Sequence, residues 1–236
     1  MTGESELAMP HQPRISGALR DAASDFFYNS WRLVPANAIW GAMLLALLVG
    51  ASIWLPAIVL LVLLGLPVVG LYHMATLIVR GMGTSFSDFL AGIGRHLVPA
   101  LALAAASALL AVVFTVNVFF GLEIGGVAGW VLSAFALYGN IALAMFLLAA
   151  WPLLTDPRRQ ELTVGRRLRL AALLIVARPG RMFGLMLVIS IVLAISTFLF
   201  AALLTVSIAY IALVSTRYVL PAADRLEGRA TAMLEP

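Results

Sequence analysis

The polar side chains inside the apolar segments are the residues that could carry chemistry, and there are few of them. Tyr138 and Asn140 flank a glycine near the middle of one apolar segment, and His73 is the only histidine inside such a segment. A phenol, an amide and an imidazole can line a path for a small solute. The same groups also serve as interhelical hydrogen bonds or as packed histidines. Tyr138, Asn140 and His73 are therefore a candidate polar intramembrane site, and both interpretations stay open.

Several kinds of chemistry lack their usual residues in this sequence. The apolar segments contain no Asp, Glu or Lys, so the buried acid typical of proton-coupled or sodium-coupled carriers is missing. The chain has no cysteine, no cluster with metal-ligand spacing and no glycine-rich phosphate loop. We therefore expect no catalytic residues, no metal and no cofactor, and we expect that the protein is not an enzyme.

A basic stretch is the second feature that could bind something. Residues 155–181 hold seven of the fifteen arginines, and the chain has no lysine. Guanidinium groups bind carboxylates and phosphates, so this stretch is a candidate docking face for a partner protein or for lipid headgroups. Setting the membrane orientation is the alternative role. The face consists of Arg158, Arg159, Arg166, Arg167, Arg169, Arg178 and Arg181.

The composition identifies the kind of protein that holds these groups. The chain has 236 residues, of which 63% are hydrophobic and 11% are charged. A soluble domain carries roughly 25% charged residues, so the sequence predicts an integral membrane protein. The net charge of +4 would suggest nucleic acid in a soluble protein. Here the arginines flank apolar segments, so we expect contact with anionic headgroups of the bilayer and no nucleic acid.

Six apolar segments are long enough to cross a bilayer, which takes roughly 20 helical residues. The uncharged run from Val34 to Val79 has 46 residues and must hold two spans, with a bend at residues 54–56. The sequence therefore predicts an all-α, polytopic transmembrane bundle within a single membrane domain, residues 15–220. The predicted spans are about 35–54, 57–79, 97–120, 128–154, 182–201 and 203–220.

Short helices that do not span are expected beside these spans. Apolar residues at helical spacing predict an interfacial helix at 16–33, with an extension of the first span as the alternative. A capping-box pattern and an amphipathic repeat predict a second at 85–95. A third helix is expected at 166–178, apolar on all sides over 168–177 and buried against protein or below the headgroups.

The arginines also predict the orientation. With six spans and both termini in the cytoplasm, all fifteen arginines fall on the cytoplasmic side. A missed span would divide them between the two sides, so the positive-inside rule supports this count. Outside the membrane domain we expect a disordered tail at residues 1–14 and a short cytoplasmic tail at residues 221–236.

An ordered series of short motifs resembles a known family. The series is Asn37-Ala38-Ile39-Trp40, Leu66 to Gly70, Ser87-Asp88-Phe89 followed by Arg95, Arg169-Leu170-Ala171, and Ala177-Arg178-Pro179-Gly180. Over residues 20–215 it resembles the YesL-like family of bacterial membrane proteins, a domain of unknown function. The resemblance implies the bacterial cytoplasmic membrane and an association with carbohydrate ABC transport, and it supplies no catalytic residue.

Three functions follow as hypotheses from these features. The first is an accessory component of a solute transport system, with an ABC-type transporter as the partner of its cytoplasmic loops. The second is a passive carrier or channel lined by Asn140, Tyr138 and His73. The third, a membrane-embedded enzyme acting on lipids, is disfavoured because acids and a metal site are missing from the apolar segments.

Overall fold

Helices make up nearly all of the chain that the computed structural model describes, which is residues 14–232 without the side chains of residues 55, 57, 58 and 229–232. This part contains no strand, and six of its helices are long and apolar enough to cross a membrane. The all-α class and the multi-pass membrane architecture are therefore confirmed. The elements are α1 Ile15–Ile53, η1 Leu55–Leu64, α2 Gly65–Val79, α3 Phe86–Ile124, α4 Gly126–Thr155, η2 Pro157–Arg159, α5 Val164–Ala177, α6 Pro179–Phe198, α7 Phe200–Ala202, η3 Leu203–Ser207 and α8 Ile208–Ala232.

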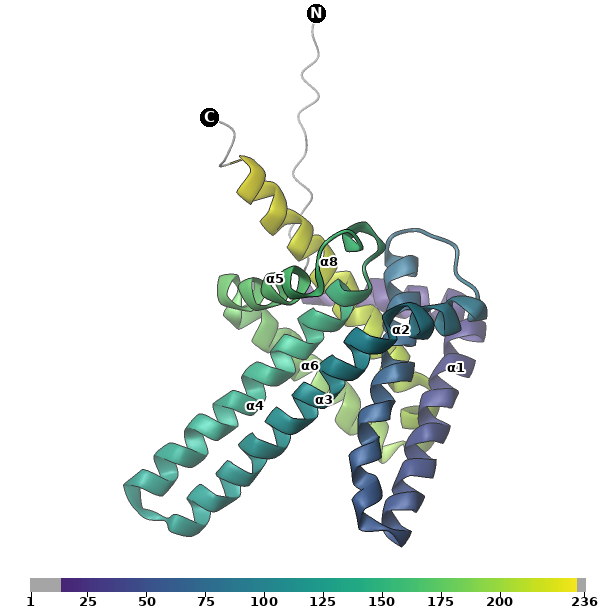
Figure 1. The fold of residues 1–236 in the computed structure, drawn as a ribbon. Helices are drawn as coiled ribbons and strands as arrows, with labels where there is room; N and C mark the ends of the chain where they lie inside the picture. Colours follow the sequence, from purple (N-terminus) through teal and green to yellow (C-terminus); the bar gives the residue numbers. More distant parts are fainter. Residues whose placement is uncertain (1–13, 233–236) are drawn as a thin grey trace, which may run out of the picture.

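One end of the bundle gathers the connections that carry the arginines. The start of α1, the end of α8, helix α5 and the α2–α3 and α4–α5 connections all lie there (Figure 1). We call this the basic end. The six spans run away from it toward the opposite side, where the connections are short and carry a single charge, on Glu123.

Helix α1 combines the expected interfacial helix 16–33 with the first span. Its first part lies across the basic end, and the rest descends as a span (Figure 1). Pro35 lies inside the helix near this change of direction. A proline there cannot donate to the carbonyl four residues earlier and its ring pushes against that carbonyl, which bends helices. The first part is tied to α8 by an ion pair between Asp25 and Arg217 Nη2 at 2.6 Å.

Helix α3 likewise combines a short helix with a span. Ser85 precedes the helix, and its backbone N–H donates to Asp88 Oδ2 at 2.7 Å, as the predicted capping box requires. The backbone leaves the helical region at His96, where φ is −113° and ψ is 18°. Pro99 follows within one turn and removes a backbone donor, which accounts for the kink. The kink separates the expected 85–95 helix from the span.

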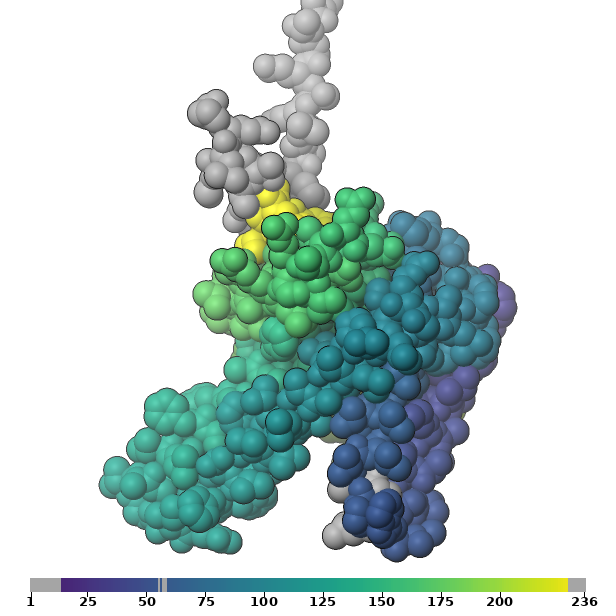
Figure 2. Space-filling view, viewed as in Figure 1, coloured from purple at the N-terminus to yellow at the C-terminus, as the bar shows by residue number. Residues whose placement is uncertain are grey.

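The spans divide into hairpins that diverge away from the basic end. The α3–α4 hairpin closes at Gly125 and Gly126, whose positive φ angles of 64° and 63° favour glycine. The α1–η1 hairpin points in another direction, so the tips of the two hairpins stand apart (Figure 2). The cleft between them is apolar and is lined from the five elements α1, η1, α2, α3 and α4 by residues that include Trp40, Gly65 and Trp151.

The last span is interrupted by the π-helix η3, and the side chain of Asn37 in α1 forms hydrogen bonds with the backbone there. Asn37 Nδ2 donates to the carbonyl oxygens of Leu204 at 2.8 Å and of Leu203 at 3.4 Å. The backbone N–H of Ala209 donates to Asn37 Oδ1 at 2.8 Å. A π-helix leaves backbone groups without their usual partners, and inside a membrane these groups need other partners. Gly41 allows the close approach, since a Cβ there would lie 2.6 Å from Leu204 O.

Two helix ends differ from the predicted boundaries. Residues 221–236 were expected to be a polar tail, but α8 continues through Pro221 to Ala232. Its extension is fixed because Ala222 and Ala223 are buried and because its carboxylates bind arginines of other elements. The fifth span starts at Pro179 rather than at residue 182, since proline suits the first turn of a helix. The part of the expected 1–14 tail before residue 14 lies outside the described residues.

Candidate functional site at the basic end

Five charged side chains form an ion cluster at the basic end, and two of them, Asp224 and Glu227, are 38% and 42% exposed. Arg80, which follows α2, binds Asp156 at 2.6 Å and Asp224 at 2.7 Å. Arg159 binds Asp224 and Glu227, both at 2.6 Å, and also pairs with Asp156. The Asp156 side chain is fully buried, and only 6% and 4% of the Arg80 and Arg159 side chains are exposed. The cluster thus joins α2, the α4–α5 connection and α8.

The electrostatics of the cluster keep its arginines charged. Burial lowers the pKa of Arg159, but the hydrogen bonds that it donates to Glu227 and Asp224 and the charge of Asp156 outweigh burial, so the pKa is raised. The pKa of Arg80 is raised for the same reason by Asp224 and Asp156. Every carboxylate of the cluster faces at least one guanidinium. This arrangement suits a fixed link between elements rather than proton transfer.

Arg167 has a structural role of a different kind. It is buried and donates to three backbone carbonyls, those of Leu154 at 2.7 Å, Gln160 at 2.9 Å and Leu162 at 3.0 Å. Burial lowers the pKa of Arg167, and the nearby charge of Asp156 opposes the shift. Its guanidinium satisfies the carbonyl of Leu154, which the end of α4 leaves without a helical partner, and two carbonyls of the α4–α5 connection. Arg159 and Arg167 belong to the candidate docking face, but both are buried and bind groups of the protein itself, so they are not accessible to a partner.

Replacing Arg167 with alanine should therefore destabilise the protein. The substitution leaves three carbonyls without their charged donor, and we expect a loss of about 2–3 kcal/mol. Thermal unfolding of the detergent-purified protein measures this loss. Arg166→Ala is the matched control, since Arg166 is exposed and its change should stay within about 0.5 kcal/mol. Equal effects of the two substitutions would contradict the assigned role of Arg167.

The other five arginines of the expected face remain accessible. Arg158, Arg166, Arg169 and Arg181 are exposed, and Arg178 is half-buried. Helix α5 carries two of them and is amphipathic, with Leu170, Ala171 and Leu174 buried against the bundle. The expectation that 168–177 is apolar on all sides is wrong, because Arg169 interrupts the run and lies on the exposed side.

An apolar groove runs between α5 and the extension of α8. Leu170, Leu173, Val176 and Ala177 line it from α5, and Leu226 lines it from α8. Val176 is 78% exposed and Leu173 is 48% exposed. Toward the start of α5, the lining changes to charged groups, which are Arg166, Arg169 and Glu227. The groove is lined from α5 and α8, and Figure 1 shows that helix α5 and the projecting end of α8 both lie at the basic end.

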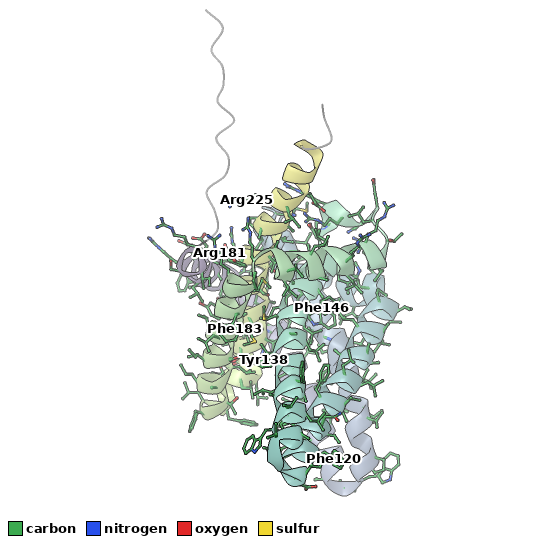
Figure 3. The ribbon with its side chains drawn as sticks, turned by 90° about the vertical axis from the view of Figure 1, so that its left-hand side faces the viewer. Phe120, Tyr138, Phe146, Arg181, Phe183 and Arg225 are labelled. Atoms are coloured by element: carbon green, nitrogen blue, oxygen red, sulfur yellow. The ribbon has the colours of Figure 1, made fainter. Side chains whose placement is uncertain are left out.

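The three residues of the expected intramembrane site do not meet. Tyr138 is 68% exposed and points outward from α4 (Figure 3), and Asn140 is half-buried. Fifteen residues, about 22 Å of helix, separate Asn140 from Thr155 at the basic end of α4. The carbonyl of Thr155 accepts a hydrogen bond from Thr76, one turn from His73. His73 therefore lies near the basic end, far from Asn140.

His73 instead packs against the first half of α3. It is buried, its ring lies 5.7 Å from the ring of His96, and a Cβ on Gly92 would lie 2.6 Å from its own Cβ. Nδ1 of His73 and Nε2 of His96 have no hydrogen-bond partner within the described residues. Residues 14–232 hold no group of three His, Cys, Asp or Glu that could bind a metal. The close packing supports the interpretation of His73 as a packed histidine.

The ion cluster is the feature that sequence reasoning missed. Arg80 was noticed only as a basic residue beside a span, and Asp156, Asp224 and Glu227 were given no role. One signal was present, since Asp224 and Glu227 are three residues apart and therefore share a helix face. Because residues 221–236 were expected to be a tail rather than part of a helix, the shared helix face of Asp224 and Glu227 was not recognised.

Comparisons with known proteins add no further assignment. No family model, no curated protein and no solved structure matches this chain. The function is therefore inferred from the chain's own residues and geometry.

Proposed function

We propose that this protein is an accessory subunit of a solute transport system in the bacterial cytoplasmic membrane. In this proposal it has no catalytic activity of its own, and it docks a transport protein through the basic end, which faces the cytoplasm according to the positive-inside rule. The resemblance to the YesL-like family suggests carbohydrate as the solute and an ABC-type transporter as the partner. The observation that supports docking is the α5–α8 groove.

The groove has the properties of a helix-binding surface. Its lining is aliphatic apart from Glu227, and its most exposed large apolar side chain, Val176, is 78% exposed. Amphipathic helices bind such grooves through apolar residues at positions i, i+3 or i+4 and i+7. A contiguous exposed apolar surface of this kind marks an interaction site.

The charges beside the groove define the chemistry of its occupant. Arg166 and Arg169 stand at one end, and neither forms an ion pair within the described residues. Guanidinium groups at the rim of an apolar surface select carboxylates. The proposed occupant is therefore an amphipathic helix of the transport protein that carries acidic residues at one end of its apolar face.

The geometry gives less support to a passive carrier. A path would need Tyr138, Asn140 and His73 around one cavity, but Tyr138 faces outward and His73 is packed against α3. At the basic end, α2 and α8 are linked by the ion pairs of the cluster, which would lie across a path between these two helices. The accessory role, by contrast, needs only the α5–α8 groove and the arginines beside it, which are exposed.

Changing the groove to an acidic surface should abolish partner binding. We expect Leu173→Glu combined with Val176→Glu to reduce the recovery of crosslinked transport components at least about tenfold, because carboxylates replace the apolar contact and repel an acidic helix. Affinity purification from native membranes, followed by mass spectrometry, measures this recovery. Val164→Glu is the matched control, as Val164 is an exposed residue of the same helix outside the groove.

Two outcomes would contradict different parts of this proposal. If the wild-type protein enriches no transport component after crosslinking, the accessory function is wrong. If the wild type enriches one and the groove variant enriches it equally, the function stands but the groove is not its docking site. Unchanged thermal stability of both variants shows that the difference does not come from unfolding.

A further inference from the structure

The first part of α1, residues 15–33, lies across the basic end and is not itself a span (Figure 1). We call these residues the lateral segment. Beyond Pro35 the same helix descends through the membrane, so the continuity of the chain places the lateral segment at the level where this span leaves the hydrocarbon. A helix at that level has water on one side and lipid on the other. The surface of the segment should therefore differ between these two sides.

One face of the lateral segment packs against the bundle. Ala18 and Ala22 are four residues apart and are 5% and 0% exposed. The hydroxyl of Tyr210 in α8 donates to the carbonyl of Leu19 at 3.3 Å. These contacts hold the segment against the bundle and fix its rotation about its own axis. The two sides that flank the buried face are left for water and for lipid.

These two sides have opposite character. Asp21 and Asp25 are four residues apart and share one side, and Tyr28 lies there too because it is seven residues from Asp21. Ala23 and Phe27 follow the two aspartates by two residues each. Two residues turn a helix by about 200°, so Ala23 and Phe27 lie on the other side. The segment thus has an acidic side and an apolar side, with the buried alanines between them.

Exposed aromatic rings mark the apolar side and the outer edge of the lateral segment. Phe27 is 75% exposed, and Trp31, one turn later, is 66% exposed. The guanidinium of Arg32 lies 4.1 Å from the centre of the Trp31 ring. Tryptophan and arginine are the residues that anchor helices at the level of the headgroups. Insertion of Phe27 between headgroups would remove its ring from water.

The lateral segment offers little electrostatic attraction to lipid. It contains two arginines and two aspartates, so its charges cancel. Its uncharged polar residues are mostly small, namely Ser16, Ser24, Asn29 and Ser30. Interfacial helices bind through the apolar area that they bury and through attraction to anionic lipids. Because the second contribution is small here, contact depends on the room that the headgroups leave for the aromatic rings.

We propose that the lateral segment is a membrane-contact surface that inserts Phe27 between lipid headgroups and that responds to lipid packing rather than to lipid charge. Trp31 lies at the headgroup level beside it, and the acidic side faces water. Loosely packed lipid leaves gaps that accept the Phe27 ring, and tightly packed lipid excludes it. The contact is separate from the α5–α8 groove and needs no partner protein.

Spin labelling of the full chain in lipid vesicles tests this contact. The chain has no cysteine, so Ala23→Cys and Asp21→Cys each give one label, and both positions are exposed. Oxygen concentrates in the bilayer and a nickel chelate stays in water, so the ratio of their collision rates with the label reports depth. In dioleoylphosphatidylcholine we expect this ratio to be at least about fivefold higher at residue 23 than at residue 21.

Changes of lipid separate packing from charge. Dioleoylphosphatidylglycerol has the same chains and an anionic headgroup, and it should leave the ratio at residue 23 unchanged. Cholesterol added to dioleoylphosphatidylcholine tightens the packing, and it should lower the ratio at least about twofold.

The aromatic residues of the two sides supply matched variants. In the Ala23→Cys protein, Phe27→Ser combined with Trp31→Ser should lower the ratio in dioleoylphosphatidylcholine at least about threefold, because the segment loses its inserted rings. Tyr28→Ser is the control, since Tyr28 is 73% exposed and adjacent to Phe27 but lies on the acidic side. It should leave the ratio unchanged. All three side chains are exposed, so equal unfolding midpoints are expected for these variants.

Each contrary result overturns a stated part of the proposal. Equal ratios at residues 21 and 23 would show that the segment does not lie in the interface. Low collision rates of both reagents at residue 23 would show that protein covers the apolar side. A higher ratio in the anionic lipid would show an electrostatic contact. A ratio that cholesterol leaves unchanged would show a contact that does not respond to packing.

Discussion

Asp156→Ala will cost the protein about 3–5 kcal/mol of unfolding free energy, which is the range for removing one partner of a buried ion pair. Asp156 is fully buried and pairs with both Arg80 and Arg159. Its removal leaves two guanidinium groups in the bundle with one carboxylate fewer between them. Because the cluster joins three parts of the chain, the loss should lower the midpoint of thermal unfolding in detergent and the yield of monodisperse protein.

Arg158→Ala is the control for this experiment. Arg158 is two residues away in the same connection, but it is exposed and forms no ion pair within the described residues. Its substitution should change stability by no more than about 0.5 kcal/mol. A midpoint for Asp156→Ala as high as that of the control would show that the cluster contributes nothing to stability.

Asn37→Leu should have the second largest effect, a loss of about 2–4 kcal/mol. Leucine has a similar size but no polar atoms, so the carbonyl of Leu204 and the N–H of Ala209 lose their partner. Unsatisfied buried backbone groups cost about 1–3 kcal/mol each. The loss should appear as a lower unfolding midpoint and as faster hydrogen exchange at residues 203–209.

Asn117→Leu is the matched control for Asn37. Asn117 also lies within a span, but it is half-buried and its amide donates an exposed hydrogen bond to the carbonyl of Val113 in its own helix. The control should retain stability, since exposure to lipid favours leucine over asparagine. If hydrogen exchange at 203–209 is unchanged in Asn37→Leu, the π-helix does not depend on this side chain.

The sequence predicts the helical fold well because each span is marked by the hydrophobicity of about twenty residues and by arginines at its ends, so that no single residue decides the prediction. The two stretches that combine a short helix with a span were both anticipated, and the turn at Pro56 and the capping box at Ser85 follow from local residue chemistry. Boundaries were less accurate where tertiary contacts extend a helix. At Pro221 the local signal favours an end, but buried contacts on both sides of the proline keep α8 continuous.

The candidate site was harder to predict because burial is not visible in the sequence. Arg158 and Arg159 are adjacent and chemically identical, yet one is exposed and the other is 3% exposed within the ion cluster. Their difference arises from Asp224 and Glu227, more than sixty positions along the chain. Tyr138 and His73 were grouped by polarity alone, and the arrangement of α2 and α4 separates them. Contacts between residues far apart in the sequence can be identified only once the fold is known.

The contribution of α8 to the ion cluster has a consequence for biosynthesis. As the chain leaves the ribosome, Arg80, Asp156 and Arg159 emerge before Asp224 and Glu227. Asp25 also emerges long before its partner Arg217, which lies 192 positions farther along the chain. The complete ion cluster and the Asp25–Arg217 pair therefore form only after α8 has been made, and until then the first five spans lack these links to α8.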